Sequence, residues 1–278
     1  MTTTRSENQH QLSKIRRLMQ WFFVAGTFLI GLRHMLPGES SKGGAFDAFC
    51  PFGGVETLWA YVTTGQTLKT TNLLNFSVLL AVLGVSLIAG RAFCGWMCPV
   101  GTLQDMFAGW ARRLSGENNQ IRGKRSKARF PTQFPPRVDK WLRYLKYLVL
   151  AVILIASTMS VYPPLHDICP ARALFSFQLT PPLLVSVLIT FIVTSMLVKR
   201  FWCKYLCPMG ALLVIFNKIS PLRVVIDRDR CTHCNRCEAE CPVDIPGIPE
   251  NIRSTECVRC LECLETCAVP DSVTLRLG

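Results

Sequence analysis

The sequence predicts a mainly α-helical protein that crosses a membrane and carries a small α+β domain at its C-terminal end. Half of the 278 residues are hydrophobic, only 18% are charged, and the mean hydropathy is +0.29. Four uncharged apolar runs precede residue 200, and the chain ends in a polar segment that is crowded with cysteine. So apolar a composition is unusual for a soluble domain and excludes a disordered chain. The length excludes a small disulfide-stapled secreted fold.

The four apolar runs predict four transmembrane helices, at about 18–36, 71–90, 143–162 and 182–199. The second run is the clearest, because it holds 20 residues without a charge. At about 1.5 Å per residue, such a helix spans roughly one hydrocarbon layer of a bilayer. Trp, Tyr, Lys and Arg flank the runs, as they do at membrane interfaces, which favours this interpretation over buried core helices.

The segments around these helices give the domain organisation. Residues 1–17 are predicted to form a short polar tail, and residues 18–220 a four-helix membrane domain. Within that domain, residues 112–140 form a basic loop between the second and third helices. The hydrophobic runs stop before residue 226, so residues 226–278 are predicted to form a separate small domain.

The distribution of the net charge of +13 predicts the orientation. Segment 112–146 alone holds 11 Lys or Arg residues against two acids, whereas loops 34–70 and 163–181 hold few basic residues. Because Lys- and Arg-rich loops stay in the cytoplasm, we expect both termini and the C-terminal domain on the cytoplasmic side of a multi-pass protein surrounded by lipid. The predicted membrane topology already explains the excess of positive charge, so nucleic acid is not an expected partner.

Two matched cysteine runs dominate the C-terminal segment. They read Cys231-x2-Cys234-x2-Cys237-x3-Cys241 and Cys257-x2-Cys260-x2-Cys263-x3-Cys267. This is the spacing with which bacterial ferredoxins hold two [4Fe–4S] clusters, the fourth cysteine of each run serving the other cluster. The predicted ligand sets are Cys231, Cys234, Cys237 and Cys267 for one cluster, and Cys257, Cys260, Cys263 and Cys241 for the other. Zinc sites use four ligands in two pairs, and disulfides are not expected in the cytoplasm.

The six other cysteines form an internal repeat. Each half of the membrane domain reads helix, Cys-Pro, helix, Cys-x3-Cys-Pro. The cysteines are Cys50, Cys94 and Cys98 in the first half and Cys169, Cys203 and Cys207 in the second. Because both halves have the same orientation, the repeat is parallel and predicts a pseudo-two-fold axis along the membrane normal. Proline is favoured at the first helical position, so each Cys-Pro pair predicts a helix that has the cysteine as its N-cap.

The repeat suggests a function for some of these thiols. Cys94, Cys98, Cys203 and Cys207 are expected to gather at the cytoplasmic membrane surface. There they either hold a further redox or metal centre or form a redox dithiol pair, and the alternative is small buried thiols that pack helix ends. Simple topology places Cys50 and Cys169 outside. Either their loops dip inward, which leaves a metal-ligand role open, or they serve another purpose such as an external disulfide.

Together, these features resemble the NapH-type membrane ferredoxins, polytopic [4Fe–4S] proteins in a superfamily with NosR, MauN and CcoG. The resemblance covers about residues 15–270 and rests on Cys94-Gly-Trp-Met-Cys98-Pro, Cys203-Lys-Tyr-Leu-Cys207-Pro and the two ferredoxin runs. It implies a bacterial inner-membrane protein that oxidises quinol, or exchanges electrons with the quinone pool, and feeds a partner redox enzyme such as a periplasmic reductase. It also implies a partner subunit that carries iron–sulfur clusters or cytochromes.

On this hypothesis the chain is an electron-transfer subunit, a component of a quinol dehydrogenase rather than a stand-alone enzyme. Its cofactors are two [4Fe–4S] clusters, with quinone or quinol as a further ligand. Two alternatives belong to other classes of function. One is an assembly or maturation factor that reduces a metal or thiols on a partner oxidoreductase, and the other is a redox-sensing membrane regulator.

Overall fold

The structure is a computed structural model that describes residues 3–33, 50–65, 73–115, 131–159, 168–175, 182–269 and 272–277. Helices make up most of it, as the sequence predicts. Before residue 220 they are α1 (Thr3–Arg33), α3 (Pro51–Thr64), α4 (Leu73–Ala89), α5 (Ala92–Trp96), α6 (Pro99–Leu114), α7 (Pro136–Met159), α8 (Pro170–Phe175), α9 (Pro182–Leu197), the π-helical turn η2 (Trp202–Leu206) and α10 (Pro208–Ile219). The C-terminal part adds β1 (Leu222–Ile226), α11 (Arg236–Glu240), α12 (Glu262–Thr266) and β2 (Val273–Leu277).

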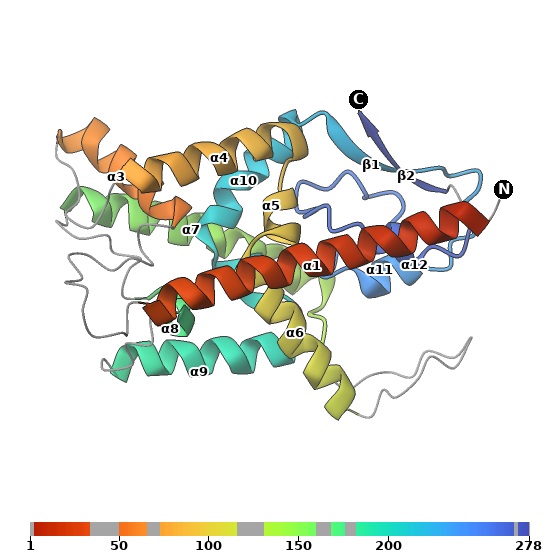
Figure 1. Ribbon diagram of the computed structural model, residues 1–278, viewed down its shortest axis with the longest axis horizontal. Coiled ribbons are helices and arrows are strands. Elements are labelled where there is room, and N and C mark those ends of the chain that lie inside the picture. Colours follow the sequence, from red (N-terminus) through yellow and green to blue (C-terminus); the bar gives the residue numbers. More distant parts are fainter. Residues whose placement is uncertain are drawn as a thin grey trace.

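The long helices share one direction, and the C-terminal elements lie at one end of them. Figure 1 shows α1 running along the longest axis of the molecule, with α4, α7 and α9 aligned roughly along the same axis. β1, β2, α11 and α12 gather beside the two chain termini. Both termini and the small C-terminal domain therefore lie at the same end of the molecule.

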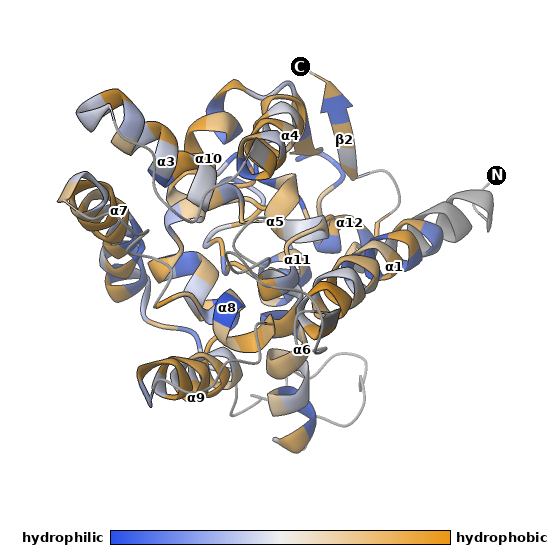
Figure 2. Ribbon diagram, turned by 60° about the vertical axis from the view of Figure 1, so that its left-hand side comes forward, coloured by the Kyte–Doolittle hydropathy of each residue, from blue (hydrophilic) through white to orange (hydrophobic). Residues whose placement is uncertain are grey.

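Within the described part of the chain, two helices are long and apolar enough to cross a membrane, namely Gln11–Leu32 within α1 and the whole of α7. α4 and α9 are strongly apolar, but they are shorter, with 17 and 16 residues. Figure 2 shows hydrophobic residues along most of α4, α7 and α9. Many of their apolar side chains face outward, and Leu80, Ile155 and Ile189 are 69%, 63% and 57% exposed. Soluble proteins rarely expose large contiguous apolar surfaces, whereas helices in contact with lipid do.

Helices α1 and α7 begin before the ranges predicted from the apolar runs, whereas α4 and α9 lie within theirs. α1 begins at Thr3 rather than near residue 18, so the described part of the expected tail 1–17 is helical. α7 begins at Pro136, inside the expected basic loop 112–140, and α6 reaches Leu114 in the same loop. An apolar run marks only the part of a helix that is expected to contact lipid. Glu, Gln, Lys and Arg have high helix propensity, so they allow the helix to continue past that part.

The Cys-Pro pairs start helices in the expected way. α3, α6 and α10 each begin at a proline, and the cysteine before it is the N-cap. These N-caps are Cys50, Cys98 and Cys207. Proline is suited to this position because its missing N–H would have no helical partner there and its φ is already helical. α8 begins at Pro170, directly after Cys169. The N-cap prediction is therefore confirmed for three of the four pairs.

The C-terminal domain combines two strands with two short helices. β1 and β2 are antiparallel, with Leu222 opposite Leu277 and Ile226 opposite Val273, and α11 packs on α12. β1 begins at Leu222, four residues before the predicted domain start at residue 226, and it pairs with the last strand. Hydrophobic periodicity alone does not separate a five-residue strand from the end of the helix before it.

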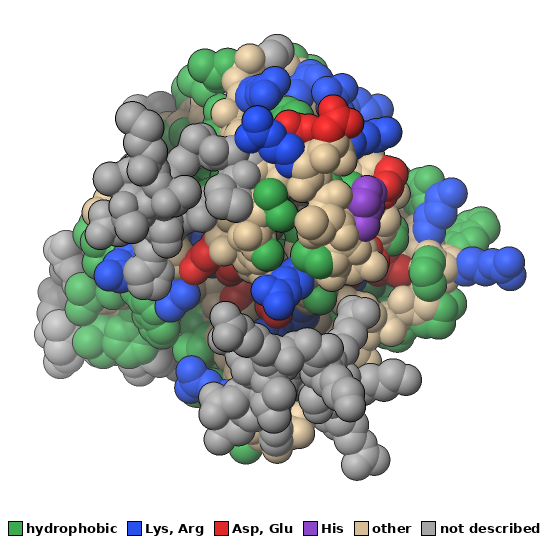
Figure 3. Space-filling view, turned by 90° about the vertical axis from the view of Figure 1, so that its right-hand side faces the viewer, with side chains coloured by type: hydrophobic (Ala, Val, Ile, Leu, Met, Phe, Trp, Pro, Cys, Tyr) green, Lys and Arg blue, Asp and Glu red, His purple; other side chains and the backbone are tan. Residues whose placement is uncertain are grey.

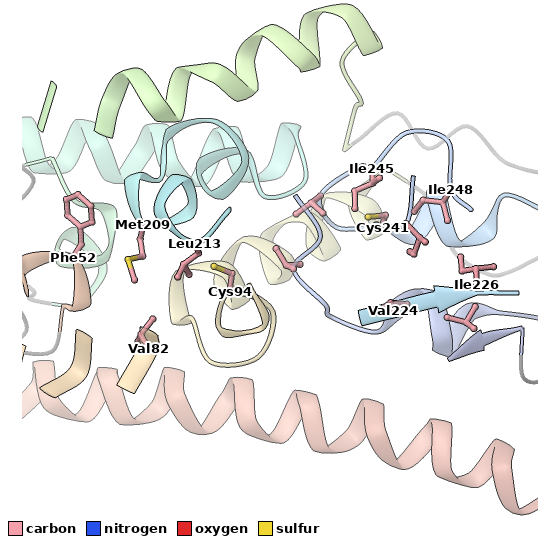
Figure 4. Close-up of a cluster of buried hydrophobic side chains, with 14 of the residues drawn as sticks. Phe52, Val82, Cys94, Met209, Leu213, Val224, Ile226, Cys241, Ile245 and Ile248 are labelled. Carbon is pink, nitrogen blue, oxygen red and sulfur yellow. The ribbon is translucent and has the colours of Figure 1, made fainter. Parts of the chain in front are cut away.

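One hydrophobic cluster joins the C-terminal domain to the helical part. Figure 4 shows Phe52, Met209 and Leu213 from the helical part in a continuous row with side chains of the C-terminal domain. Val224 and Cys241 are among the latter, and they are 4% and 9% exposed. The small domain is therefore packed against the helices through a shared core.

Candidate iron–sulfur sites

The two cysteine runs of the C-terminal domain adopt the same backbone conformation. His233 and Arg259, at equivalent positions, have φ values of 50° and 49°. Asn235 and Leu261, also equivalent, have φ values of 57° and 63°. Each run then continues into a five-residue helix, α11 or α12. Positive φ is uncommon for residues other than glycine, so two such residues at matching places show that both runs wrap around their centres in the same way.

Four thiols line one open cavity in the C-terminal domain. They belong to Cys231, Cys234, Cys237 and Cys267, so the fourth cysteine of the second run joins three from the first. Cys234 is exposed, and the N–H of Arg236 donates a hydrogen bond that lowers the pKa of the Cys234 thiol. A lower pKa favours the thiolate, which is the form that binds iron. His233 also lies at this cavity and is exposed.

The other four thiols of the two runs form a second, more buried group. Cys263 lies close enough to Cys241, Cys257 and Cys260 to interact with all three electrostatically, and Cys241 also interacts with Cys257 and Cys260. Burial raises the pKa of Cys257 to about 11 and that of Cys260 to about 12. Such thiols stay neutral at physiological pH unless a metal replaces their protons. Cys263 also interacts with Cys237, so the two groups of four adjoin each other.

The structure also brings together four cysteines of the helical part. Cys94 and Cys98 lie at α5 and at the start of α6, and Cys203 and Cys207 lie in η2 and at the start of α10. Each of the four interacts electrostatically with the other three. Cys94 and Cys203 are buried, and Gln104 donates a hydrogen bond of 3.0 Å to the Cys203 sulfur. Each half of the repeat therefore contributes one Cys-x3-Cys pair to a single group.

Cys50 and Cys169 form a separate pair. They interact electrostatically with each other, and Cys50 also interacts with Glu56, which is 1% exposed. Cys50 packs against the shared hydrophobic core, and Asn75 donates a hydrogen bond of 3.2 Å to its carbonyl oxygen. Cys50 therefore lies against the shared core, with Cys169 close to it.

A buried ion cluster joins the C-terminal domain to the helices. Glu256 accepts hydrogen bonds from Arg91 of the helical part at 2.7 Å and from Lys146 of α7 at 2.5 Å. The two basic side chains are 2% and 0% exposed. Burial alone would raise the pKa of Glu256, but the two cations hold it below its usual value. A carboxylate in this setting is ionised and ties the domain to two helical segments.

A second group of polar contacts also joins the C-terminal domain to the helical part. Lys204 pairs with Asp244 at 2.9 Å, and Arg143 donates hydrogen bonds to the carbonyl oxygens of Val243 and Asp244. Lys199 donates to the carbonyl oxygen of Ala239. Sequence reasoning interpreted the basic residues beside the apolar runs as membrane anchors. A cation at a helix end looks the same in sequence whether it faces lipid headgroups or another domain.

Family models for iron–sulfur proteins match three segments of the chain. A 4Fe–4S binding domain matches residues 71–116 and 180–226, so it covers both halves of the internal repeat. A 4Fe–4S dicluster domain matches residues 223–268. No solved structure matches the chain.

Several curated proteins are similar in sequence to this chain. YccM of Escherichia coli, named as an electron transport protein, is 27% identical over 92% of this chain and 71% of its own length. The ferredoxin-type protein NapH of the same species is 29% identical over 93% of this chain and 87% of its own length. The regulatory protein NosR of Pseudomonas aeruginosa is 28% identical over 65% of this chain, which is 24% of NosR. The chain therefore belongs to the family of NapH- and NosR-like membrane 4Fe–4S proteins, with a role in electron transfer.

Proposed function

We propose that this protein is a membrane-bound electron-transfer subunit that holds two [4Fe–4S] clusters in its C-terminal domain. Cys231, Cys234, Cys237 and Cys267 would bind one, and Cys241, Cys257, Cys260 and Cys263 the other. The observation that carries this proposal is the sorting of eight thiols into two adjoining groups of four, one of them around an open cavity. When bound, each cluster takes up and releases one electron at a time.

The surroundings of the two groups suit different roles. Cys234 is exposed at the surface of the domain, whereas Cys260 packs against the helical part. The first group is therefore the natural point of contact for a soluble redox partner. The second group faces the membrane-embedded helices, on the side from which electrons of a quinol would arrive.

For the membrane domain, we propose that α1, α4, α7 and α9 all cross the bilayer. Support comes from the outward-facing apolar side chains of α4 and α9, which match those of the longer α7. The bilayer thins locally around short helices at a modest cost in free energy, so lengths of 16 and 17 residues are compatible with spanning. Lys and Arg remain concentrated between α6 and α7.

Reporter fusions are expected to place this basic loop in the cytoplasm. A reporter active only in the cytoplasm should work when inserted within residues 120–130, because Lys- and Arg-rich loops are retained on that side. A reporter active only outside should work within residues 40–48. Figure 3 shows acidic and basic side chains interspersed over the end that carries the C-terminal domain, as suits a surface in water. External activity of a fusion within residues 120–130 would overturn the orientation.

The electron donor that we propose is a quinol, whose oxidation releases two electrons and two protons. The purified full-length protein, kept free of oxygen in detergent, should show bleaching of its visible iron–sulfur absorbance when a menaquinol or ubiquinol analogue is added. Dithionite serves as the positive control for cluster reduction. If dithionite bleaches the protein and no quinol of either class does, the quinol proposal fails.

The six cysteines of the helical part divide into a group of four, for which we propose a function, and a separate pair. Cys94, Cys98, Cys203 and Cys207 are proposed to hold a further redox or metal centre. Cys50 and Cys169 lie apart from these four and interact mainly with each other, so we assign them no ligand role in that centre.

A further inference from the structure

We propose that Cys94, Cys98, Cys203 and Cys207 bind a third iron–sulfur cluster of the four-thiolate class, held between the two halves of the internal repeat. This inference rests on the proposed electron-transfer function and specifies the centre at these cysteines. All six pairings among the four thiols are close enough for electrostatic interaction. A redox-active dithiol requires only one Cys-x3-Cys pair. Two separate dithiols would not require the pair of one half to lie beside the pair of the other.

Each half of the repeat places one arginine beside a cysteine of the other half. Arg91 and Arg200 occupy equivalent positions, three residues before the first cysteine of each pair. Arg200 donates a hydrogen bond of 3.1 Å to the carbonyl oxygen of Cys94 in the other half. Arg91 in turn interacts electrostatically with Cys207 of the other half. Both arginines are 1% exposed, so each half places a buried cation beside the thiols of the other.

Equivalent glycines allow close packing around the four cysteines. A Cβ atom on Gly101 would lie 3.0 Å from the carbonyl oxygen of Cys94. A Cβ atom on Gly210 would lie 3.1 Å from Nη2 of Arg91 and 3.2 Å from the carbonyl oxygen of Cys203. Both glycines follow the second cysteine of their pair by three residues. The absence of a side chain at both places therefore lets backbone and guanidinium approach the thiols closely.

The charges around the site are those of an anion-binding centre. Arg91, Lys146 and Glu256 form a buried group with one positive charge in excess. Nε of Arg91 is buried and has no hydrogen-bond partner. Buried cations and buried N–H groups normally have partners, so these features point to an anionic ligand beside Arg91. Four cysteine thiolates around a [4Fe–4S] cluster supply such an anion, whereas four neutral thiols do not.

The spacing of the thiols favours a cluster over a single metal ion. Among the described residues, no three Cys, His, Asp or Glu side chains lie close enough to share one ion. This holds for the eight cysteines of the ferredoxin runs as well as for these four. A cube of iron and sulfide fills the space between its thiolates, so its ligands lie farther apart than those of zinc.

The site lies directly against the second thiol group of the C-terminal domain. Gly95, between Cys94 and Cys98, packs so closely that its Cβ would lie 3.4 Å from Cα of Cys260. Trp96 donates a hydrogen bond of 3.0 Å to the carbonyl oxygen of Arg259. Arg200 interacts with both Cys203 and Cys260. Centres whose protein ligands touch are close enough to exchange electrons, so the third cluster would link the membrane to the ferredoxin-like domain.

Metal and sulfide analysis of the full-length protein tests this inference. The wild-type chain, purified without oxygen, should hold about twelve irons and about twelve acid-labile sulfides. Cys203→Ser and, as an independent variant, Cys98→Ser should each lose about four irons and keep about eight. Cys50→Ser is the matched control, because it removes a thiol of the same repeat outside the four, and it should keep the wild-type count. Low-temperature EPR of the reduced protein should lose one signal in the first two variants only.

Two results would overturn the third cluster. One is a wild-type count of about eight irons that neither Cys203→Ser nor Cys98→Ser changes. The other is about one zinc per chain that disappears in these variants, which would assign the site to a structural metal. Failure of the two-cluster proposal is distinguishable, because it would show as far fewer than eight irons left in Cys203→Ser.

Discussion

Serine in place of Cys241 is expected to remove the cluster of the second cysteine run and to leave the cluster of its own run intact. Cys241 lies with Cys257, Cys260 and Cys263, while Cys267 lies at the cavity of the first run. The single variant should therefore lose about four irons. Iron analysis of two double variants shows which cluster is lost.

The double variants separate crossed from local ligand sets. Cys241→Ser combined with Cys260→Ser should lose no more iron than Cys241→Ser alone, because both residues hold the same cluster. Cys241→Ser combined with Cys234→Ser should lose about eight irons, because these residues hold different clusters. The opposite pattern, in which the pair with Cys234 is the non-additive one, would show that each run binds its own cluster.

Glutamine in place of Glu256 is expected to destabilise the contact between the C-terminal domain and the helices by about 3–5 kcal/mol. The reason is that Arg91 and Lys146, which are 2% and 0% exposed, would lose their carboxylate and remain buried as cations. Thermal unfolding in detergent should show the loss. Hydrogen exchange should rise across α12 and β1, at the face where the domain meets the helices.

A control and a rescue accompany this variant. Glu250→Gln changes an exposed carboxylate of the same domain and should alter the free energy of unfolding by less than about 0.5 kcal/mol. Lys146→Met added to Glu256→Gln removes one of the two unpaired cations, so the double variant should be less destabilised than the sum of the single ones. A loss for Glu256→Gln that is no larger than for Glu250→Gln would contradict the role of this ion cluster.

Several features of the fold were predictable because they depend on residues close together in sequence. Cysteine before proline predicted the N-caps of α3, α6 and α10, since capping is decided within one helical turn. The spacing of the eight C-terminal cysteines predicted an iron–sulfur domain, which the family comparison supports. The apolar runs predicted the positions of α4, α7 and α9. They did not predict that α1 and α7 begin several residues earlier, or that α6 extends into the basic loop.

Other features depended on contacts between distant segments. Sequence reasoning left open whether Cys50 and Cys169 lie outside or inward, and the structure places Cys50 against the shared core. Glu256 was missed altogether, because a single acid before a cysteine carries no signal of its own. Its importance comes from Arg91 and Lys146, which lie more than 100 residues earlier in the chain.

By itself, the sequence determined the residue types and spacings on which the chemistry of this protein depends: the thiol runs, the Cys-Pro helix starts and the apolar helices. These are local properties, set by backbone geometry, helix propensity and hydropathy over a few turns. The repeat also led us to expect that its two halves bring four thiols together. Only the tertiary structure decided that each of these thiols lies close to the other three, and that the ferredoxin-like domain packs against this group. Such proximity depends on which buried charges and apolar faces find partners when the chain is packed, and a linear pattern does not contain those distances.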